Sequence, residues 1–591
     1  MPNKASGRLA GRGPALLALL PLALLVATFG LLPFGAAVGS SLVHDVYGQR
    51  SWAGLESYRL LVEDRAFALS LGISLAWATL STILTAALGF ALACALLEAG
   101  NGFSLLFASL LVPWGVPSFI SVPLWRMILH GSGGRSILTR LLGLRINLLT
   151  DPAAGFFASL GVEVWLGVPL TAFAVYAALG AADKGIIESA KMDGAGSWAI
   201  ARWIRAPLAR NTVLVMAALD FVKSFKEFSV PFLMTAGGPP FLGGITERHI
   251  VGATTTLEIF LYEAFRDQAD ASVPSAYAVA VGLLVMVLVA AWLALRSRLR
   301  QPDPARNARI EPRFSGQAAE AAWKAFLLIL GLMFVISSAA LLYAVVWLSF
   351  SDLPAAYLDS LLPRFLSARP FRLVLGEEGI LKYFLNTFLV AGTAAFLAPL
   401  VVFPAARALS RSPSAASAKA FAGVQALGMA GGMHSLIPLV AVFKAVGLLG
   451  GYAPVILVYV FHALPFSLFT IKAFMERLSP ELEDAASIEG MGRFSYAARI
   501  LLPLSAPALA ASMMAAFISA WNGFLVPLVF LSEEKLFTIG VKLHGYVGSA
   551  ASGNPQWNLF AAASVLNMAF VGLLMWKFKD PLRRNPLADA G

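Results

Sequence analysis

Charged residues, cysteines and histidines are all scarce in this chain of 591 residues. Only 13% of the residues are charged, 58% are hydrophobic, and the mean hydropathy is +0.76. Soluble domains carry about a quarter charged residues, so this deficit excludes an ordinary soluble domain and indicates a membrane protein. The single cysteine, Cys94, excludes an internal disulfide, and its apolar surroundings in the sequence are typical of a small buried side chain.

The motifs of soluble enzymes and of nucleic-acid-binding proteins are absent as well. The six histidines are scattered, with no H-E-x-x-H pair and no Cys–His spacing for a metal, so we expect neither a metal nor a cofactor. There is no G-x-x-x-x-G-K-[ST] loop, which excludes ATP hydrolysis by this chain itself. The net charge of +11 comes from short basic segments beside apolar runs, so we expect no nucleic acid as a partner.

Long apolar segments are abundant, and each is near the ~20 residues that a helix needs to cross a bilayer. In the first half they lie near 14–36, 68–97, 104–128, 155–180, 209–234 and 273–295. In the second half they lie near 323–349, 384–408, 418–446, 451–475, 506–530 and 557–577, with GMAGGMHSLIP interrupting the segment near 418–446. We therefore predict an all-α polytopic membrane protein with about twelve transmembrane helices in two six-helix halves.

Basic residues predict the orientation and the division of the chain. Lys4, Arg8 and Arg12 precede a first apolar run that exceeds the ~7–15 residues of a signal-peptide core, which favours a transmembrane helix. Further basic clusters lie in the linker and the tail, so both termini are expected in the cytoplasm. The predicted divisions are an N-terminus at 1–13, a first membrane domain at 14–296, a linker at 297–322, a second membrane domain at 323–577 and a tail at 578–591.

One polar stretch occurs twice. ESAKMDGAGSWAIARWIRAPL begins at Glu188 and DAASIEGMGRFSYAARILLPL begins at Asp484. Gly194 aligns with Gly490 and Pro207 with Pro503, both at the same offset (490 − 194 = 503 − 207 = 296). Each copy predicts a short amphipathic helix, a glycine turn and a proline at the entry to the next span. A membrane-surface helix is the alternative for one copy, whereas two matched copies favour a pair of docking helices and a duplicated module.

The repeated stretch resembles the cytoplasmic coupling loop of bacterial ABC importer permeases, written E-A-A, three residues, G, nine residues, I-x-L-P. The chain departs from it at Ser189, Ala206 and Asp484. LVPWGVPSFIS and PFLMTAGGP in the first half, and LNTFLVAG and AWNGFLVPLVFL in the second, resemble the two permeases of the carbohydrate-uptake (maltose-type) group, fused here into one chain with homologous halves. The resemblance assigns ATPase coupling to Glu188, Ala190, Asp193, Gly194 and Pro207, and to Asp484, Ala486, Glu489, Gly490 and Pro503.

Charged residues inside apolar segments are costly and therefore candidates for function. Glu163 is expected near the outer end of its span, and Lys223 and Glu227 are four residues apart on one predicted helix. An i,i+4 ion pair and a role in a solute cavity both remain open for these two. In the second half Trp521, Asn522 and His434 are expected to face the pathway, with His434 hydrogen-bonding the backbone of a broken helix as its alternative.

The same resemblance places the solute site in the first half. Its members would be Trp114, Ser118, Glu163, Leu166, Gly167, Leu170, Lys223, Ser224 and Glu227. In the family, neutral asparagines stand at three of these places, where this chain has Glu163, Ser224 and Glu227. That departure puts maltose itself in doubt and admits a modified or charged sugar.

The resemblance implies a multi-pass subunit of the bacterial inner membrane, surrounded by lipid and forming a pathway for a carbohydrate. Its expected partners are two ABC ATPase subunits and an extracytoplasmic solute-binding protein. A permease for a non-sugar or charged solute is the first alternative. An ion-driven secondary transporter and a membrane-embedded enzyme are further alternatives, which predict essential intramembrane acids and a clustered catalytic set, respectively.

Overall fold

The computed structural model describes residues 12–46, 49–130, 143, 147–181, 183–246, 249–267, 270–298, 316–352, 366–411, 414–429, 431–548 and 555–583. Almost all of the described secondary structure is helical; the strands form two small antiparallel hairpins, β1–β2 and β3–β4. The predicted all-α membrane class is therefore confirmed. Most of the predicted linker, at 299–315, and the end of the tail lie outside the described residues.

The first half contains α2 (Arg12–Val26), a π-helical turn (Ala27–Leu31), α3 (Leu32–Ser41), β1 (Val43–Val46), β2 (Gln49–Trp52), α4 (Glu56–Glu63), α5 (Arg65–Glu98), a 3₁₀ turn (Gly100–Gly102), α6 (Phe103–Gly115), α7 (Ser118–His130) and α9 (Pro152–Gly180). It continues through α10 (Lys184–Met192), α11 (Ser197–Ile200), a π-helical turn (Ala201–Arg205), α12 (Ala206–Phe225), α13 (Ser229–Thr235), β3 (Pro240–Ile245), β4 (Ile250–Gly252), α14 (Leu257–Asp267) and α15 (Ser272–Arg298).

The second half contains α16 (Gln317–Ser349), α17 (Arg369–Leu375), α18 (Ile380–Arg411), α19 (Ala415–Met429), α20 (Met433–Ala445) and α21 (Tyr452–Met475). It continues through α22 (Glu481–Ile488), α23 (Arg493–Tyr496), a π-helical turn (Ala497–Leu501), α24 (Leu502–Leu504), α25 (Ala506–Trp521), α26 (Leu525–Phe530), a 3₁₀ turn (Glu534–Leu536), α27 (Ile539–Val547) and α28 (Trp557–Arg583).

The predicted count of twelve spans resolves into straight and broken helices. Among the described residues, eight helices are long and apolar enough to cross a membrane, and three helix pairs are bent at a short break. The pair α6–α7 is bent by 107°, and the pair at the predicted interruption near 418–446 by 91°. The remaining predicted segment, near 209–234, contains α12, which carries the charged residues Arg210, Asp220 and Lys223. Prolines near the breaks lack the amide that a continuous helix requires, and glycines there have low helix propensity.

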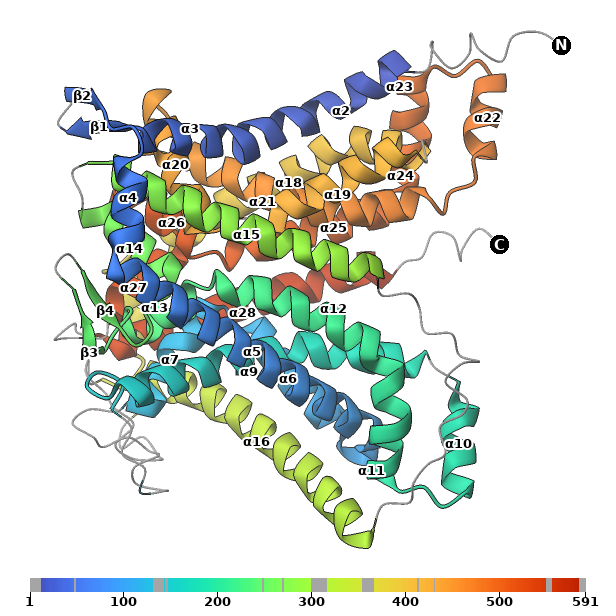
Figure 1. Ribbon diagram of the computed structural model, residues 1–591. Coiled ribbons are helices and arrows are strands. Elements are labelled where there is room, and N and C mark those ends of the chain that lie inside the picture. Colours follow the sequence, from blue (N-terminus) through green and yellow to red (C-terminus); the bar gives the residue numbers. More distant parts are fainter. Residues whose placement is uncertain are drawn as a thin grey trace.

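The two halves exchange helices (Figure 1). The helices α5, α9 and α12 pack together in the first half, and α18, α21 and α25 pack together in the second. However, α16 of the second half packs on α5, α6 and α7, while α2 packs on α18, and both α3 and α15 pack on α20. Each half therefore contributes helices to the helix packing of the other, and one apolar core extends through both halves.

Candidate functional site: two polar loops and a cavity between the halves

The two predicted coupling helices have the same geometry. The turn after α10 contains Gly194 (φ +84°) and the turn after α22 contains Gly490 (φ +75°), both in the left-handed region that favours glycine. After α10 the amide of Ala195 donates to the carbonyl of Ala190 (2.9 Å), and after α22 the amide of Met491 donates to Ala486 (2.9 Å). This pattern is a Schellman C-cap, and it explains why both copies place a small, buried alanine four residues before the glycine.

The likeness continues through both loops. The π-helical turns at 201–205 and 497–501 lie at the same offset of 296 residues (497 − 201). Each π-helical turn is followed by a proline, Pro207 in the first turn of α12 and Pro503 in α24. A proline lacks the amide that a regular helical hydrogen bond requires. Figure 1 shows α10 and α22 projecting at the same end of the molecule, where α2 and α16 begin. The predicted glycine turns and proline entries are thus present in both loops.

Two apolar residues at the tips of these helices were missed in the sequence. Met192 and Ile488 are each 88% exposed, and they occupy equivalent positions (488 − 192 = 296). Glu188, Asp193, Asp484 and Glu489 are also exposed around them. A single exposed apolar side chain is ordinary on a protein surface, but these two recur at equivalent positions of two matched helices. The offset that aligned the glycines also aligns these two, so the signal was available.

Each loop forms an ion pair with a long helix of its own half. The first loop contributes the arginine of its pair, and the second loop contributes the glutamate. In the first half Arg205 donates to Glu98 at the end of α5 (2.5 Å), and Ser197 donates to the same carboxylate (2.6 Å). In the second half Arg407 of α18 donates to Glu483 of α22 (2.5 Å). Each coupling loop is thus joined to a long helix of its own half by an ion pair.

The charged residues predicted for the solute site form an ion pair that the sequence did not indicate. Lys223 contacts Glu163 (Nζ–Oε1 2.8 Å) rather than Glu227, and Ser224 lies 3.4 Å from the same carboxylate oxygen. The i,i+4 pair does not form because α12 ends at Phe225; the Glu227 carboxylate instead accepts the amide of Ser229 (2.9 Å) and begins α13. Glu163 is 1% exposed and lies about 16 Å from the start of α9.

The other predicted solute residues are distributed around this pair. Gly167 lies beside Thr85 and Asp220, where a Cβ would be 3.3 Å from the Thr85 hydroxyl. Trp114 and Leu170 are each about half exposed, and the Trp114 ring packs edge-on against Phe173 of α9. Ser118 is the first residue of α7, and Leu166 lies on α9 one turn after Glu163. The assignment of these residues to a solute stays a prediction.

A polar cavity of about 280 Å³ lies between the two halves at three helix breaks. Lys226 and Glu227 line it from the break after α12, Gly431 and Gly432 from the break before α20, and Asn522 from the break after α25. The other polar side chains of the lining are those of Ser229, Tyr459, His462 and Ser519. Lys226 donates across the boundary to the Gly431 carbonyl (2.7 Å). Of the predicted residues only Glu227 and Asn522 line this cavity, so the sequence missed most of it.

Two second-half residues expected at the pathway have structural partners. The Trp521 ring is buried and its Nε1 donates to Asn567 (3.1 Å). His434 Nδ1 lies 2.8 Å from Glu258 of α14, and the same carboxylate accepts the Met433 amide at the start of α20. Glu258 therefore accepts a backbone amide at the start of α20 as well as contacting His434, and these contacts join the two halves.

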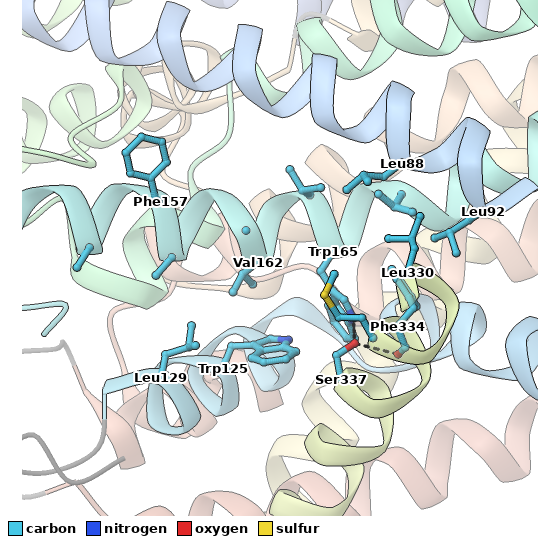
Figure 2. Close-up of a pocket in the computed structure, with 16 residues that line it drawn as sticks. Leu88, Leu92, Trp125, Leu129, Phe157, Val162, Trp165, Leu330, Phe334 and Ser337 are labelled. Atoms are coloured by element: carbon cyan, nitrogen blue, oxygen red, sulfur yellow. Dashed lines mark hydrogen bonds between the residues drawn. The ribbon is translucent and has the colours of Figure 1, made fainter. Parts of the chain in front are cut away.

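A second cavity, of about 520 Å³, is almost wholly apolar (Figure 2). Trp125, Phe157, Val162 and Leu330 line it, and the Trp165 Nε1 donates to the Ser337 hydroxyl (3.1 Å). This cavity provides too few polar groups for a hydroxylated solute, because such a solute loses hydrogen bonds to water when it enters an apolar site. The polar cavity is therefore the better candidate for a pathway.

Two matched helix–turn loops at one end, in an all-helical membrane protein with broken spans, define a transporter permease. The chain belongs to the family of binding-protein-dependent transport system inner membrane components, which it matches twice, over residues 86–301 and 381–575. It is thus a permease subunit of an ABC importer in the inner membrane, and the family implies ATPase and binding-protein partners. As a transport component it is not an enzyme, and the ion-driven transporter is set aside.

Several curated relatives are sugar permeases. The trehalose/maltose transport system permease protein MalF of Thermococcus litoralis is 27% identical, over 50% of this chain and 97% of that protein. The sulfoquinovosyl glycerol transport system permease protein SmoH of Agrobacterium fabrum is 29% identical, over 34% of this chain and 70% of that protein. The alpha-glucoside transport system permease protein AglG of Rhizobium meliloti is 30% identical, over 37% and 58%, respectively. Half of this chain thus covers nearly all of the first relative.

Proposed function

We propose that this chain forms the whole translocation pathway of an ABC importer for a carbohydrate. The observation that carries the proposal is the pair of loops with the same C-cap, the same π-helical turn and the same exposed apolar tip. Each loop would seat one ATPase subunit, so that a single chain would engage two. The ATPases would move α10 and α22, and the anchoring pairs Glu98–Arg205 and Arg407–Glu483 would carry the movement to α5 and α18.

In this proposal the end that carries α10 and α22 faces the cytoplasm, together with both termini. The opposite end carries the β1–β2 and β3–β4 hairpins and α14 (Figure 1). An extracytoplasmic binding protein would release its solute there. Closing of the ATPases would then favour the outward-open state, because a partner shifts such an equilibrium only by binding one state better than the other.

The relatives support a carbohydrate as the solute, since those named above are sugar permeases. The polar cavity supports the same class, because it presents hydroxyl, amide, imidazole and charged groups at once. A charged or non-sugar solute is the second candidate, because Lys226 or Glu227 would pair with a solute group of opposite charge, although their own charges balance. Binding of a panel of neutral and charged sugars to the co-encoded binding protein separates the two.

Reconstitution with the co-encoded ATPase and binding protein tests the coupling loops. We expect Gly194→Val and Gly490→Val to reduce ATP-dependent uptake at least tenfold, because a β-branched residue is strongly disfavoured at positive φ. Gly492→Val is the matched control, since nothing lies within 4 Å of a Cβ there and its φ is not positive. Uptake at the wild-type rate in the Gly194→Val/Gly490→Val double variant would contradict the docking role.

A further inference from the structure

The offset of 296 residues between the coupling loops continues into the membrane helices. Pro169 of α9 matches Pro465 of α21 (465 − 169 = 296). The same offset pairs Glu163 with Tyr459, Leu166 with His462, Lys223 with Ser519, Lys226 with Asn522 and Glu227 with Gly523. The last two pairs fall at the breaks after α12 and α25, so these helices break at equivalent residues. The offset therefore relates these positions on α9, on α12 and at the break after α12 to α21, α25 and the break after α25.

The first-half residues and their second-half counterparts differ in whether their polar groups have partners. In the first half Glu163 and Lys223 are bound to each other (2.8 Å). In the second half Tyr459 is only 6% exposed, and its hydroxyl has no hydrogen-bond partner among the described residues. That hydroxyl lies against the backbone of Gly523, where an added Cβ would be 1.9 Å away. A buried phenol without a partner costs free energy unless a ligand or water supplies one.

The cavity brings the second-half counterparts together with the first-half break. Tyr459, His462, Ser519 and Asn522 line it on one side, and Lys226 and Glu227 line it on the other. We infer that the solute binds in this cavity and that the second half supplies most of its contacts, through Tyr459, His462, Ser519 and Asn522. This inference rests on the proposed function, and it moves the site away from the first-half set that the family resemblance implies.

The lining also indicates the chemical class of the solute. A sugar hydroxyl both donates and accepts, and the cavity offers an ammonium donor, a carboxylate acceptor and hydroxyl, amide and imidazole groups that do either. The volume of about 280 Å³ is just below the ~300–1,000 Å³ typical of ligand sites, which favours a small solute. A mono- or disaccharide without net charge fits this set, since Lys226 and Glu227 contribute opposite charges.

Transport kinetics test the second-half contacts. Tyr459→Phe removes only the hydroxyl, and we expect it to raise the apparent KM of the reconstituted importer for its solute about five- to tenfold, as loss of one hydrogen bond does. Asn522→Ala is expected to act in the same direction. Tyr452→Phe, at the start of the same helix, is the control and should change KM less than twofold. An unchanged KM in both cavity variants would overturn the inference.

Thiol labelling tests the location without knowledge of the solute. The only native cysteine is buried, so Ser519→Cys and Asn522→Cys can be made in a Cys94→Ala chain assembled with its ATPases. We expect a polar maleimide to label both positions in one nucleotide state and at least tenfold more slowly in the other. Ser512→Cys is the control that we expect to remain unlabelled. Ser512 lies on α25, as Ser519 does, but it is buried against Ser467 of α21. Absence of labelling at both positions in every state would overturn the site. Gated labelling without protection by any sugar supports the site and contradicts the carbohydrate proposal instead.

Discussion

Single residues show how charge is carried inside this apolar protein. Glu163 is almost completely buried, and Lys223, whose side chain is about half exposed, is its partner at 2.8 Å. Removing one member of such a pair leaves the other charge without compensation, whereas replacing both with apolar groups removes the cost of burying them. The Glu163–Lys223 contact therefore acts first as a joint between α9 and α12.

Variants of this pair separate a structural role from solute contact. We expect Glu163→Gln and Lys223→Met each to destabilise the purified protein by about 1–3 kcal/mol, and the Glu163→Leu/Lys223→Met double variant to recover most of the loss. Thermal unfolding in detergent measures this. Arg59→Ala, which removes an exposed i,i+4 pair with Glu63, is the control and should change stability little. A double variant less stable than either single variant would contradict a structural role of the Glu163–Lys223 ion pair between α9 and α12.

The same residues show what the sequence could predict at this scale. Glu163, Lys223 and Glu227 were recognisable as costly charges because membrane spans rarely contain any. Their partners were not, because the end of α12 at Phe225 depends on tertiary packing and on the break that follows. Tyr459 and His462 look like ordinary span residues, and only the 296-residue offset sets them opposite Glu163 and Leu166.

At the scale of elements, α16 holds the first coupling loop from the other half. Glu320 accepts the amides of Trp198 (2.9 Å) and Ala199 (3.2 Å) at the start of α11, and the Trp198 and Trp323 rings pack 5.0 Å apart. A carboxylate at a helix N-terminus satisfies its unpaired amides and its dipole. The sequence predicted the loop and α16 separately, but gave no sign that they touch.

Glu320 therefore acts as a positioning residue for the loop. We expect Glu320→Ala to loosen α11 by about 1 kcal/mol, so that amide exchange at Trp198 and Ala199 accelerates about fivefold. Glu320→Gln should have a smaller effect, since it retains an acceptor. Hydrogen-exchange mass spectrometry of residues 195–205 measures this, with the exposed Glu377→Ala as control. Equal exchange rates in wild type and Glu320→Ala would contradict the positioning role of Glu320.

The β1–β2 hairpin carries a pH-dependent contact outside the spans. Asp270 (2.7 Å) and Glu56 (3.4 Å) hydrogen-bond the His44 ring and raise its pKa above the usual 6.5. The contribution of this contact to stability is therefore complete below pH 6.5 and is lost as the pH rises through the raised value. We expect the protection factors of residues 43–52, which are exchange rates corrected for the intrinsic base-catalysed rate at each pH, to fall between pH 6 and 8 in wild type. His44→Gln should remove this fall in protection; if the fall persists, His44 is not its source.

At the scale of the whole molecule, the exchange of α2 and α16 binds the halves into one body. Because α16 packs on α5, α6 and α7 while α2 packs on α18, neither half completes its helix layer alone. The composition predicted two membrane halves, and the repeat predicted that they are related, as the two family matches confirm. The exchange itself was not predictable, since all of these helices are apolar around most of their surface.

The proposed function predicts an assembly of one chain and two ATPase subunits. Each loop presents one exposed apolar tip, Met192 or Ile488, so one chain supplies two docking contacts. We expect native mass spectrometry of the purified importer to give a chain-to-ATPase ratio of 1:2. Met192→Asp or Ile488→Asp, which places a charge in one apolar contact, should lower this to about 1:1 while the membrane level of the chain stays unchanged, and the double variant should lose both ATPases. Glu481→Asp, exposed at the start of α22, is the control. A wild-type complex with two chains per ATPase pair would contradict a self-sufficient fused chain, because each chain would then engage only one ATPase.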